Sequence, residues 1–307
     1  MTPSLFGNVV AEPVTPALKW HGGKAYLADK IIALMPRHLH YVEPFFGGGQ
    51  VLFRRDPADR RLWWDKKTSD GRDADGVSEV VNDLDGDLMN FYRVLKDPNL
   101  FADLQRRLEL TLFSEAEWQG ACQLLQGGQD DPVLRAAALF VQVRQSRSGL
   151  RTSFSPPVRT RLRGGRNDGV NAWWRAVDGL ADVHRRLSDV LVLNRPAVDV
   201  IVSQDESSTL FYLDPPYLHE TLAAKRAFGK FEMTAADHRQ LLDVVRQCEG
   251  KVILSGYPSQ LYDTALAGWS RHTFDLPNNA AGGKAKGREI EVVWCNFERR
   301  GEAPAVA

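Results

Sequence analysis

The tetrapeptide Asp214-Pro215-Pro216-Tyr217 is the set of residues best suited to chemistry in this 307-residue chain. It ends the apolar run 210–214, and because proline donates no backbone hydrogen bond, a predicted strand must stop there. In open α/β sheets this carboxyl edge binds ligands. A carboxylate beside a prolyl carbonyl accepts from both N–H donors of a nucleobase amine, and the tyrosine ring can stack on that base. Taken alone, the tetrapeptide is also compatible with an ordinary turn.

A glycine-rich segment, Glu43-Pro44-Phe45-Phe46-Gly47-Gly48-Gly49, follows another predicted strand and fits the pattern FxGxG. Glycines past a strand let the backbone approach a ligand closely. The segment lacks the lysine of a phosphate-binding loop, so a nucleoside-like cofactor is predicted instead of a triphosphate.

Asp83 ends the next predicted strand, where an acidic residue can accept from ribose hydroxyls. It lies 34 residues after Gly49, which exceeds the usual spacing of about 20 because the segment Asp56–Gly76 intervenes. The alternative role for Asp83 is an N-cap of the following helix. Upstream, Lys19-Trp20-His21-Gly22-Gly23-Lys24 is a weaker signal, since such a turn could equally be a basic surface loop.

Positive charge is concentrated in one stretch, although 39 basic and 39 acidic residues balance over the chain. Residues 133–167 contain eight arginines and no Asp or Glu. Arg135 falls on an apolar helix pattern and is expected to lie on a solvated face. The others are interleaved with Ser, Thr, Gly and Pro, which favours a phosphate-binding surface. They are Arg144, Arg147, Arg151, Arg159, Arg161, Arg163 and Arg166.

These residues require an alternation of strands and helices, which is typical of a parallel or mixed sheet with crossover helices. The predicted strands are 40–46, 78–83, 210–214, 251–257 and 288–297, and the predicted helices are 88–97 and 234–248. The middle of the chain, 98–189, shows helical periodicity and then contains the basic stretch, which predicts a mainly helical lobe inserted between two halves of the α/β domain.

Together, the motifs KWHGGK, VEPFFGGG, VVNDLDGDLMNFYRVL and LFYLDPPY resemble the Dam-like DNA adenine N6-methyltransferases in their order and spacing. The resemblance covers most of 18–297. It implies a Rossmann-like S-adenosylmethionine-dependent methyltransferase sheet, double-stranded DNA as substrate with a flipped adenine, and a target-recognition region between FxGxG and DPPY. The implied division is 1–97 and 190–298 for the catalytic domain, 98–189 for target recognition and 299–307 for a tail.

The same resemblance implies roles for individual residues. The implied catalytic residues are Asp214, Pro215, Pro216 and Tyr217. The implied cofactor-binding residues are Trp20, Lys24, Glu43, Phe45, Gly47, Gly49, Asp83 and Asp214. Two departures are visible: Asn194-Arg195-Pro196-Ala197 stands where the family often has an Asp-Phe pair, and 147–151 replaces the Asn-rich recognition hairpin.

Some other classes of protein share part of this pattern. A cytosine-C5 methylase needs a nucleophilic cysteine, usually after proline, and Cys122, Cys248 and Cys295 have no such context. A cytosine-N4 DNA or an RNA amino-methyltransferase would use the same amine chemistry, and an inactive DNA-binding relative would keep the fold. Cysteine usage predicts a cytoplasmic protein without a metal site, and the resemblance implies one encoded by a bacterium or phage. The resemblance also leaves room for a restriction endonuclease counterpart.

Overall fold

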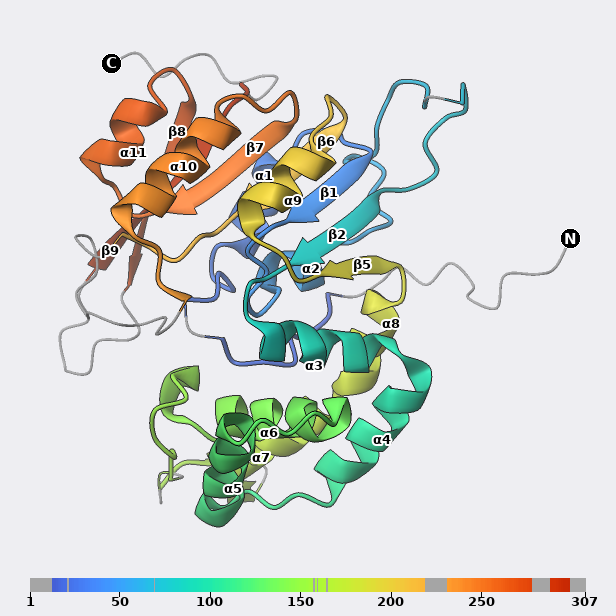
Figure 1. The fold of residues 1–307 in the computed structure, drawn as a ribbon, viewed down its shortest axis with the longest axis vertical. Helices are drawn as coiled ribbons and strands as arrows, with labels where there is room; N and C mark the ends of the chain where they lie inside the picture. Colours follow the sequence, from blue (N-terminus) through green and yellow to red (C-terminus); the bar gives the residue numbers. More distant parts are fainter. Residues whose placement is uncertain are drawn as a thin grey trace, which may run out of the picture.

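The computed structural model describes residues 13–20, 22–68, 70–156, 158, 160–163, 165–218, 231–277 and 288–298. Within them, seven strands form one sheet in the order β5-β2-β1-β6-β7-β9-β8 (Figure 1). Strands β5, β2, β1, β6 and β7 are parallel, and β9 runs antiparallel to β7 and β8. The strand bounds are β1 His40–Glu43, β2 Ser78–Asn82, β5 Val190–Leu193, β6 Thr209–Leu213, β7 Lys251–Gly256, β8 Ser270–Pro277 and β9 Arg288–Cys295. This confirms the expected Rossmann-like α/β fold.

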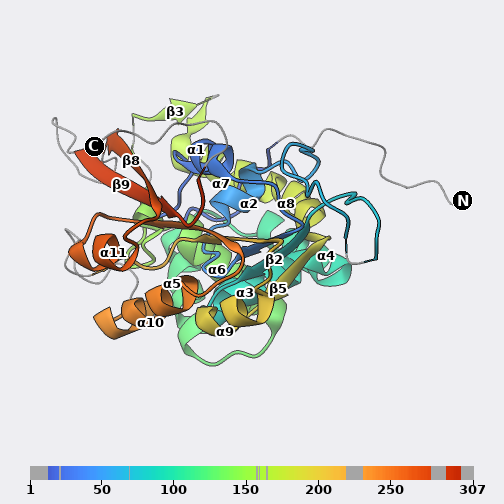
Figure 2. The same cartoon turned by 90° about the horizontal axis from the view of Figure 1, so that it is seen from above.

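Helices cover both faces of the sheet because successive strand residues point to opposite sides. Tyr41 and Tyr212 belong to one apolar cluster with helices α1 and α2. Val42 and Phe211 belong to a second cluster with α9, α10 and α11, on the other face (Figure 2). These helices are α1 Ala28–Leu34, α2 Gln50–Arg54, α9 Ala197–Gln204, α10 Ala235–Val245 and α11 Gln260–Ala265.

The middle of the chain forms a helical lobe below the sheet in Figure 1. Asp97, Ser114 and Asp131 cap three of its helices with their side chains, two of which begin with proline, so the sequence defines their starts locally. The lobe shares one apolar cluster with the sheet, since Leu104, Phe140 and other lobe residues join the cluster that contains Tyr41. Helix α3 Gly86–Lys96 leads from β2 into the lobe. The lobe's own elements are α4 Pro98–Glu109, α5 Glu115–Gln126, α6 Pro132–Arg144, η1 Arg147–Gly149, β3 Leu162–Arg163, β4 Arg166–Asn167, α7 Asp168–Asp178 and α8 Leu180–Leu187.

Arg135 differs from its expected place on a solvated face. Its guanidinium forms an ion pair with Asp87 of α3, and both side chains are mostly buried. The reason is tertiary, because α6 packs across α3 and brings the two residues together. Arg135 therefore joins the lobe to the segment that leads out of β2.

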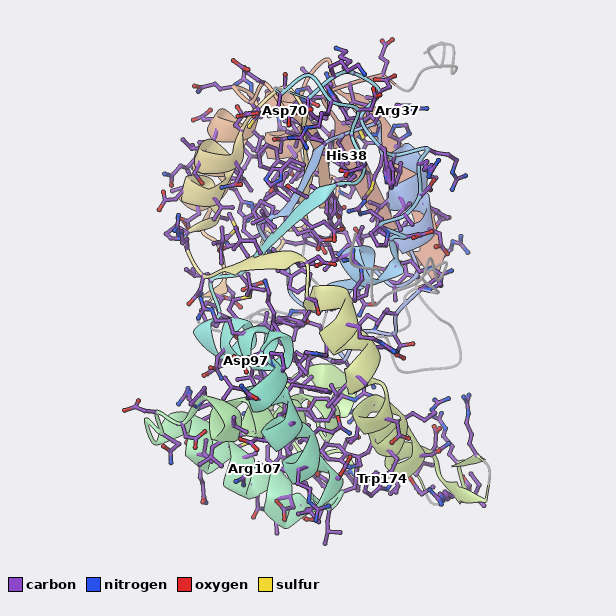
Figure 3. The ribbon with its side chains drawn as sticks, turned by 90° about the vertical axis from the view of Figure 1, so that its right-hand side faces the viewer. Arg37, His38, Asp70, Asp97, Arg107 and Trp174 are labelled. Carbon is purple, nitrogen blue, oxygen red and sulfur yellow. The ribbon has the colours of Figure 1, made fainter. Side chains whose placement is uncertain are left out.

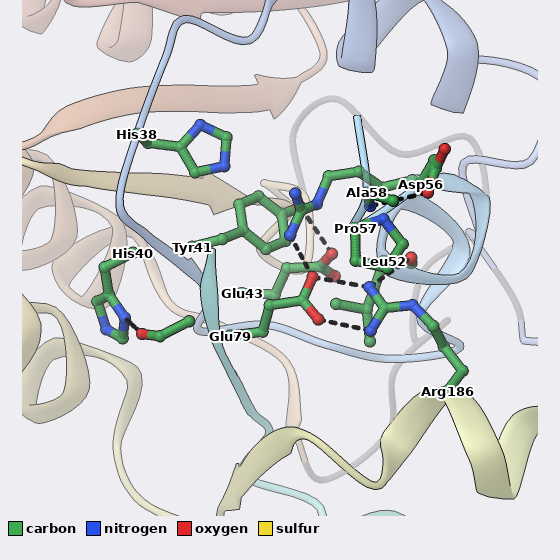
Figure 4. A network of polar contacts seen from close by, with 12 residues as sticks. His38, His40, Tyr41, Glu43, Leu52, Asp56, Pro57, Ala58, Glu79 and Arg186 are labelled. Atoms are coloured by element: carbon green, nitrogen blue, oxygen red, sulfur yellow. Dashed lines mark hydrogen bonds and ion pairs between the residues drawn. The ribbon is translucent and has the colours of Figure 1, made fainter. Parts of the chain in front are cut away.

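A buried ionic cluster ties the sheet to the lobe (Figure 4). Glu79 of β2 accepts from Arg186 of α8 at 2.5 and 2.7 Å and also pairs with Arg55, which follows α2. Arg186 additionally reaches the carbonyl of Leu52 at 3.3 Å. A buried charge is tolerated only when it is paired and hydrogen-bonded. This cluster therefore fixes α8, the last helix of the lobe, against the sheet.

The inserted segment Asp56–Gly76 lies at the amino-terminal edge of the sheet, away from the lobe. Trp63 forms a bridge with His38 and donates to the carbonyl of Pro57 at 3.1 Å. Figure 3 places Asp70 and His38 at the opposite end of the molecule from Arg107 of the lobe. In the part of the chain that is described, no helix has both the length and the apolar character needed to cross a bilayer.

Candidate active site at the carboxyl edge of the sheet

Strand β6 is fully buried and delivers Asp214 at its carboxyl end. Lys24 Nζ lies 2.9 Å from Asp214 Oδ1 and also donates to the Gly22 carbonyl at 2.9 Å. The Lys24 side chain is 4% exposed and that of Asp214 is 18% exposed. Burial raises the pKa of Asp214, while Lys24 opposes that rise. The structure thus brings together two residues that are 190 positions apart in the sequence.

Tyr217 lies directly above this ion pair. Lys24 Nζ is 4.7 Å from the centroid of its ring, and the ring meets Tyr257 edge to face at 4.5 Å. Its hydroxyl donates to Glu291 Oε2 at 2.7 Å and lies 3.4 Å from Asp214 Oδ1. Pro215 is buried and Pro216 half-buried, as expected for a tight exit from the strand. The side chains of Asp214 and Tyr217 therefore meet at the carboxyl end of β6, beside Lys24.

The glycine-rich turn after β1 lies under Trp20. Gly47 and Gly49 have φ values of 50° and 66°, in the left-handed region. A Cβ atom at Gly48 would lie 2.6 Å from Trp20 Cβ, and one at Gly49 would lie 2.5 Å from the Phe46 ring. Only glycine meets both demands, a positive φ and a close neighbour. Trp20 and the turn are therefore adjacent, as the motif order implied.

Asp83 joins the ends of β1 and β2. Its Oδ2 accepts from Gly47 N at 2.9 Å and its Oδ1 from Asp85 N at 3.0 Å. Burial raises its pKa to about 6. The N-cap of α3 is Asp85, not Asp83, so the alternative role of Asp83 as a helix cap is wrong. Asn194 donates to the Asp83 carbonyl at 2.7 Å. The segment 194–197, which differs from the family pattern, therefore lies at the same edge of the sheet.

Glu43 and Phe45 frame the other side of the turn. Glu43 is buried and accepts from the Tyr41 hydroxyl at 2.7 Å, and burial raises its pKa to about 8. Phe45 is half-buried against the cluster that contains Val42, on the α9 and α10 face. The predicted cofactor residues thus surround one turn from two sides.

The sequence interpretation did not identify two residues at this edge, Glu291 and Leu84. Glu291 lies on β9 and accepts from Tyr26 at 3.1 Å as well as from Tyr217. Leu84, next to Asp83, exposes 56% of its surface although it is large and apolar. The buried glutamate is the informative one of the two, because a carboxylate is seldom buried unless it is paired. A sequence signal existed only for Glu291, as a carboxylate within a strand pattern.

The residues present fit the cofactor that the resemblance implies. S-adenosylmethionine carries a sulfonium and an ammonium group, ribose hydroxyls and a flat base. Three carboxylates, of Glu43, Asp83 and Asp214, lie around the glycine turn, and Lys24 pairs with that of Asp214. The glycines leave a cradle in which added side chains would collide. Acidic groups beside a backbone cradle match a cationic nucleoside.

The predicted DNA-binding arginines separate into two groups. Arg144 is half-buried and donates to the Ala172 carbonyl at 2.9 Å, and burial lowers its pKa to about 10. Arg151 pairs with Asp85 at 3.3 Å, lies over the Trp20 ring at 5.2 Å and has a φ of 61°. Four others are exposed: Arg147, Arg161, Arg163 and Arg166. Arg159 lies outside the described residues.

Comparison with known proteins identifies the family of the chain. Residues 20–121 and 151–276 match the family described as D12 class N6 adenine-specific DNA methyltransferase. The chain is 24% identical to the type II methyltransferase M1.LlaDCHI of Lactococcus lactis subsp. cremoris, over 92% of this chain and 95% of that protein. It is 32% identical to the type II methyltransferase M.MjaIII of Methanocaldococcus jannaschii over 102 residues, which are 31% of this chain and 28% of that protein. The chain therefore belongs to the D12 class of N6 adenine-specific DNA methyltransferases, enzymes that use S-adenosylmethionine to methylate adenine in DNA.

Proposed function

We propose that Asp214, a prolyl carbonyl and Tyr217 grip the amino group of a target adenine. The observation that carries this proposal is the Lys24–Asp214–Tyr217 cluster beside the glycine turn. Among the described residues, the ion pair of Asp214 with Lys24 and its 3.4 Å contact with the Tyr217 hydroxyl both fall on Oδ1. Its Oδ2 can therefore accept one amine hydrogen while the Pro215 carbonyl accepts the other.

These two acceptors have a chemical purpose. The lone pair of an adenine amine is delocalised into the ring, which makes the nitrogen a poor nucleophile. Hydrogen bonds to Asp214 and Pro215 favour a pyramidal nitrogen with a localised lone pair. Catalysis then rests on positioning and on electrostatic stabilisation. Tyr217 would stack on the base, which must leave the duplex at a cost of a few kcal/mol.

We assign the cofactor to the surroundings of the glycine turn. Trp20, Lys24, Glu43, Phe45, Gly47, Gly49, Asp83 and Asp214 would hold it. When bound, S-adenosylmethionine supplies an activated methyl group. Asp83 would accept from ribose hydroxyls, because its carboxylate stands at the end of β2. The sulfonium charge would be favoured by the nearby carboxylates of Glu43 and Asp214.

The exposed arginines of the lobe would contact DNA phosphates. Arg147, Arg161 and Arg163, with Arg166, project from the segment between α6 and α7. Arg159 remains part of the predicted set. Arg144 and Arg151 are only partly exposed and bind groups within the protein, and we assign them to holding this segment in place. The lobe as a whole, 98–189, would recognise the target sequence.

The printed names of both relatives suggest a biological setting. Each is called a type II methyltransferase, and on that basis we propose a restriction endonuclease counterpart. We place the protein in the cytoplasm with its DNA, as its three free cysteines favour a reducing compartment.

The test of the proposed function is transfer of a labelled methyl group from S-adenosylmethionine to duplex DNA. Wild-type protein should label adenine, and Asp214→Ala should lose at least about a hundredfold in kcat, the effect of removing a positioned polar group. Circular dichroism and thermal unfolding should show that the variant is folded. Full activity of Asp214→Ala, or label on cytosine, would contradict the proposal.

A further inference from the structure

Strand β9 has an inverted polarity where it reaches the active site. Neighbouring residues in a strand point to opposite faces. Here Ile290 is 47% exposed, whereas Glu291 is 2% exposed. Burying a carboxylate while exposing an isoleucine is unfavourable for folding alone. The arrangement therefore indicates that Glu291 serves the site.

Two tyrosine hydroxyls converge on Glu291. Tyr217 donates to Oε2 at 2.7 Å and Tyr26 donates to Oε1 at 3.1 Å. The pairing of β7 with β9 runs as far as Gly256 opposite Val292, so Glu291 lies just beyond it, at the catalytic edge. Burial raises the pKa of Glu291, and the negative charge of Asp214 raises it further. Lys24 and the hydrogen bonds from the two tyrosines lower it. The charged neighbours Lys24 and Asp214 both belong to the active site.

We infer that Glu291 is a positioning residue that holds the Tyr217 hydroxyl away from Asp214. The inference rests on the proposed function of Asp214. A phenol has one hydroxyl hydrogen to donate. The Tyr217 hydroxyl is 2.7 Å from Glu291 and 3.4 Å from Asp214, so Glu291 takes that hydrogen.

Without Glu291, the same hydroxyl would turn to Asp214. The carboxylate already accepts from Lys24 at 2.9 Å. A second donor from within the protein would compete with the target amine for the oxygens that must accept its hydrogens. Glu291 thereby keeps Asp214 available to substrate and also fixes the tilt of the ring on which the base stacks.

Two conservative substitutions separate reach from charge. Glu291→Gln keeps the length and one acceptor oxygen but loses the charge. Glu291→Asp keeps the charge but withdraws the carboxylate by one methylene. We expect kcat of Glu291→Asp to fall about tenfold or more, the worth of a hydrogen bond to a charged group. Glu291→Gln should stay within about threefold of wild type, because a neutral hydrogen bond remains.

The effect should pass through the Tyr217 hydroxyl. In a Tyr217→Phe background no hydroxyl can turn to Asp214, so Glu291→Asp should cause no further loss of kcat. KM for DNA and the Kd for S-adenosylhomocysteine, measured by calorimetry, should be unchanged by Glu291→Asp. The matched control is Ile290→Val, a change on the exposed side of the same strand, which should leave every value unaltered.

Several results would overturn the inference. Equal kcat for Glu291→Asp and wild type would do so. A loss of kcat in Glu291→Gln but not in Glu291→Asp would also do so, because it would show that the charge of Glu291 matters and its reach does not. Losses that multiply in the double variant would show that the two residues act independently. If the wild-type protein methylates adenine and any of these results is obtained, only the inference about Glu291 fails. A wild type that transfers no methyl group to adenine removes the proposed function and this inference with it.

Discussion

At the scale of single residues, the site is dominated by carboxylates with raised pKa values. Burial raises the pKa of Glu43 to about 8 and that of Asp83 to about 6, and it raises the pKa of Asp214 despite Lys24. Burial disfavours the charged form of a carboxylate, and an approaching cation restores it. A site of this kind is therefore electrostatically matched to a positively charged cofactor.

The pKa of Asp83 leads to a pH-dependent prediction. An ionised Asp83 accepts hydrogen bonds from ribose hydroxyls, whereas its protonated form has lost acceptor capacity. Because the pKa is about 6, affinity for S-adenosylhomocysteine should be greatest above about pH 7 and should fall as the pH drops toward 5. Titration calorimetry between pH 5 and 8 measures this dependence.

The control for this prediction is Asp83→Asn, which cannot ionise. It should bind more weakly at pH 8 and show little change between pH 6.5 and pH 5. A wild-type affinity that is flat over the same range would mean that Asp83 does not contact the ribose.

At the scale of elements, the glycine turn is packed closely by neighbouring aromatic side chains. Trp20 packs on Gly47 and Gly48, and the rings of Phe46 and Phe53 surround Gly49. The Tyr92 hydroxyl of α3 donates to the Gly47 carbonyl at 3.1 Å. The segment before α1, the turn after β1 and helix α3 therefore form one assembly, so that disturbing the turn would disturb all three.

Two glycines with similar backbone angles allow packing to be separated from strain. Gly49 has a φ of 66° with the Phe46 ring 2.5 Å from an added Cβ, whereas Gly128 has a φ of 72° with open space around it. Gly128→Ala should reduce the free energy of unfolding by about 1 kcal/mol through backbone strain. Gly49→Ala should lose about 1–3 kcal/mol more, because overpacking adds to that strain.

Urea unfolding measures both values, and the difference between them isolates the ring contacts. Equal losses for the two variants would show that the aromatic rings move aside freely. In that case the turn would owe its glycine to backbone angle alone.

At the scale of the whole molecule, the lobe is held to the sheet by a shared apolar cluster and by buried ions. Leu104 and Phe140 of the lobe belong to the same cluster as Tyr41 of the sheet. The Glu79–Arg186 pair lies within the interior, and the ion pair of Arg151 with Asp85 joins the basic segment to the start of α3. DNA held by the lobe would thus be placed at a fixed distance from Asp214.

The charge distribution predicts how DNA binding depends on salt. If the four exposed arginines, Arg147, Arg161, Arg163 and Arg166, each neutralise one phosphate, the logarithm of the binding constant should fall with a slope of about −3.6 against the logarithm of salt concentration. Arg161→Ala should reduce that slope by about 0.9. Fluorescence anisotropy at several salt concentrations gives the slope.

Arg37 provides the matched control, because it is half-exposed but lies at the opposite end of the molecule (Figure 3). Arg37→Ala should leave the slope unchanged. A wild-type slope near zero would remove the exposed arginines from the DNA interface.

The sequence by itself determined the strands that carry the motifs, since an apolar run ended by proline or glycine leaves the chain few alternatives. Strands β1, β2, β6, β7 and β9 and helices α3 and α10 overlap the predicted segments and differ from them at their ends. Strands β5 and β8 were not predicted, because Val190–Leu193 is short and Ser270–Pro277 has mixed polarity.

Only the tertiary structure decided which distant residues meet. Lys24 pairs with Asp214, Arg135 with Asp87, and Glu291 with Tyr217. No local pattern encodes these pairs, because each depends on strand order and on how the lobe packs. An arginine's spacing likewise cannot reveal whether it lies in solvent, as Arg161 does, or over Trp20, as Arg151 does. Local propensity selects elements, whereas burial and long-range contact select partners, and the chemistry of this site depends on both.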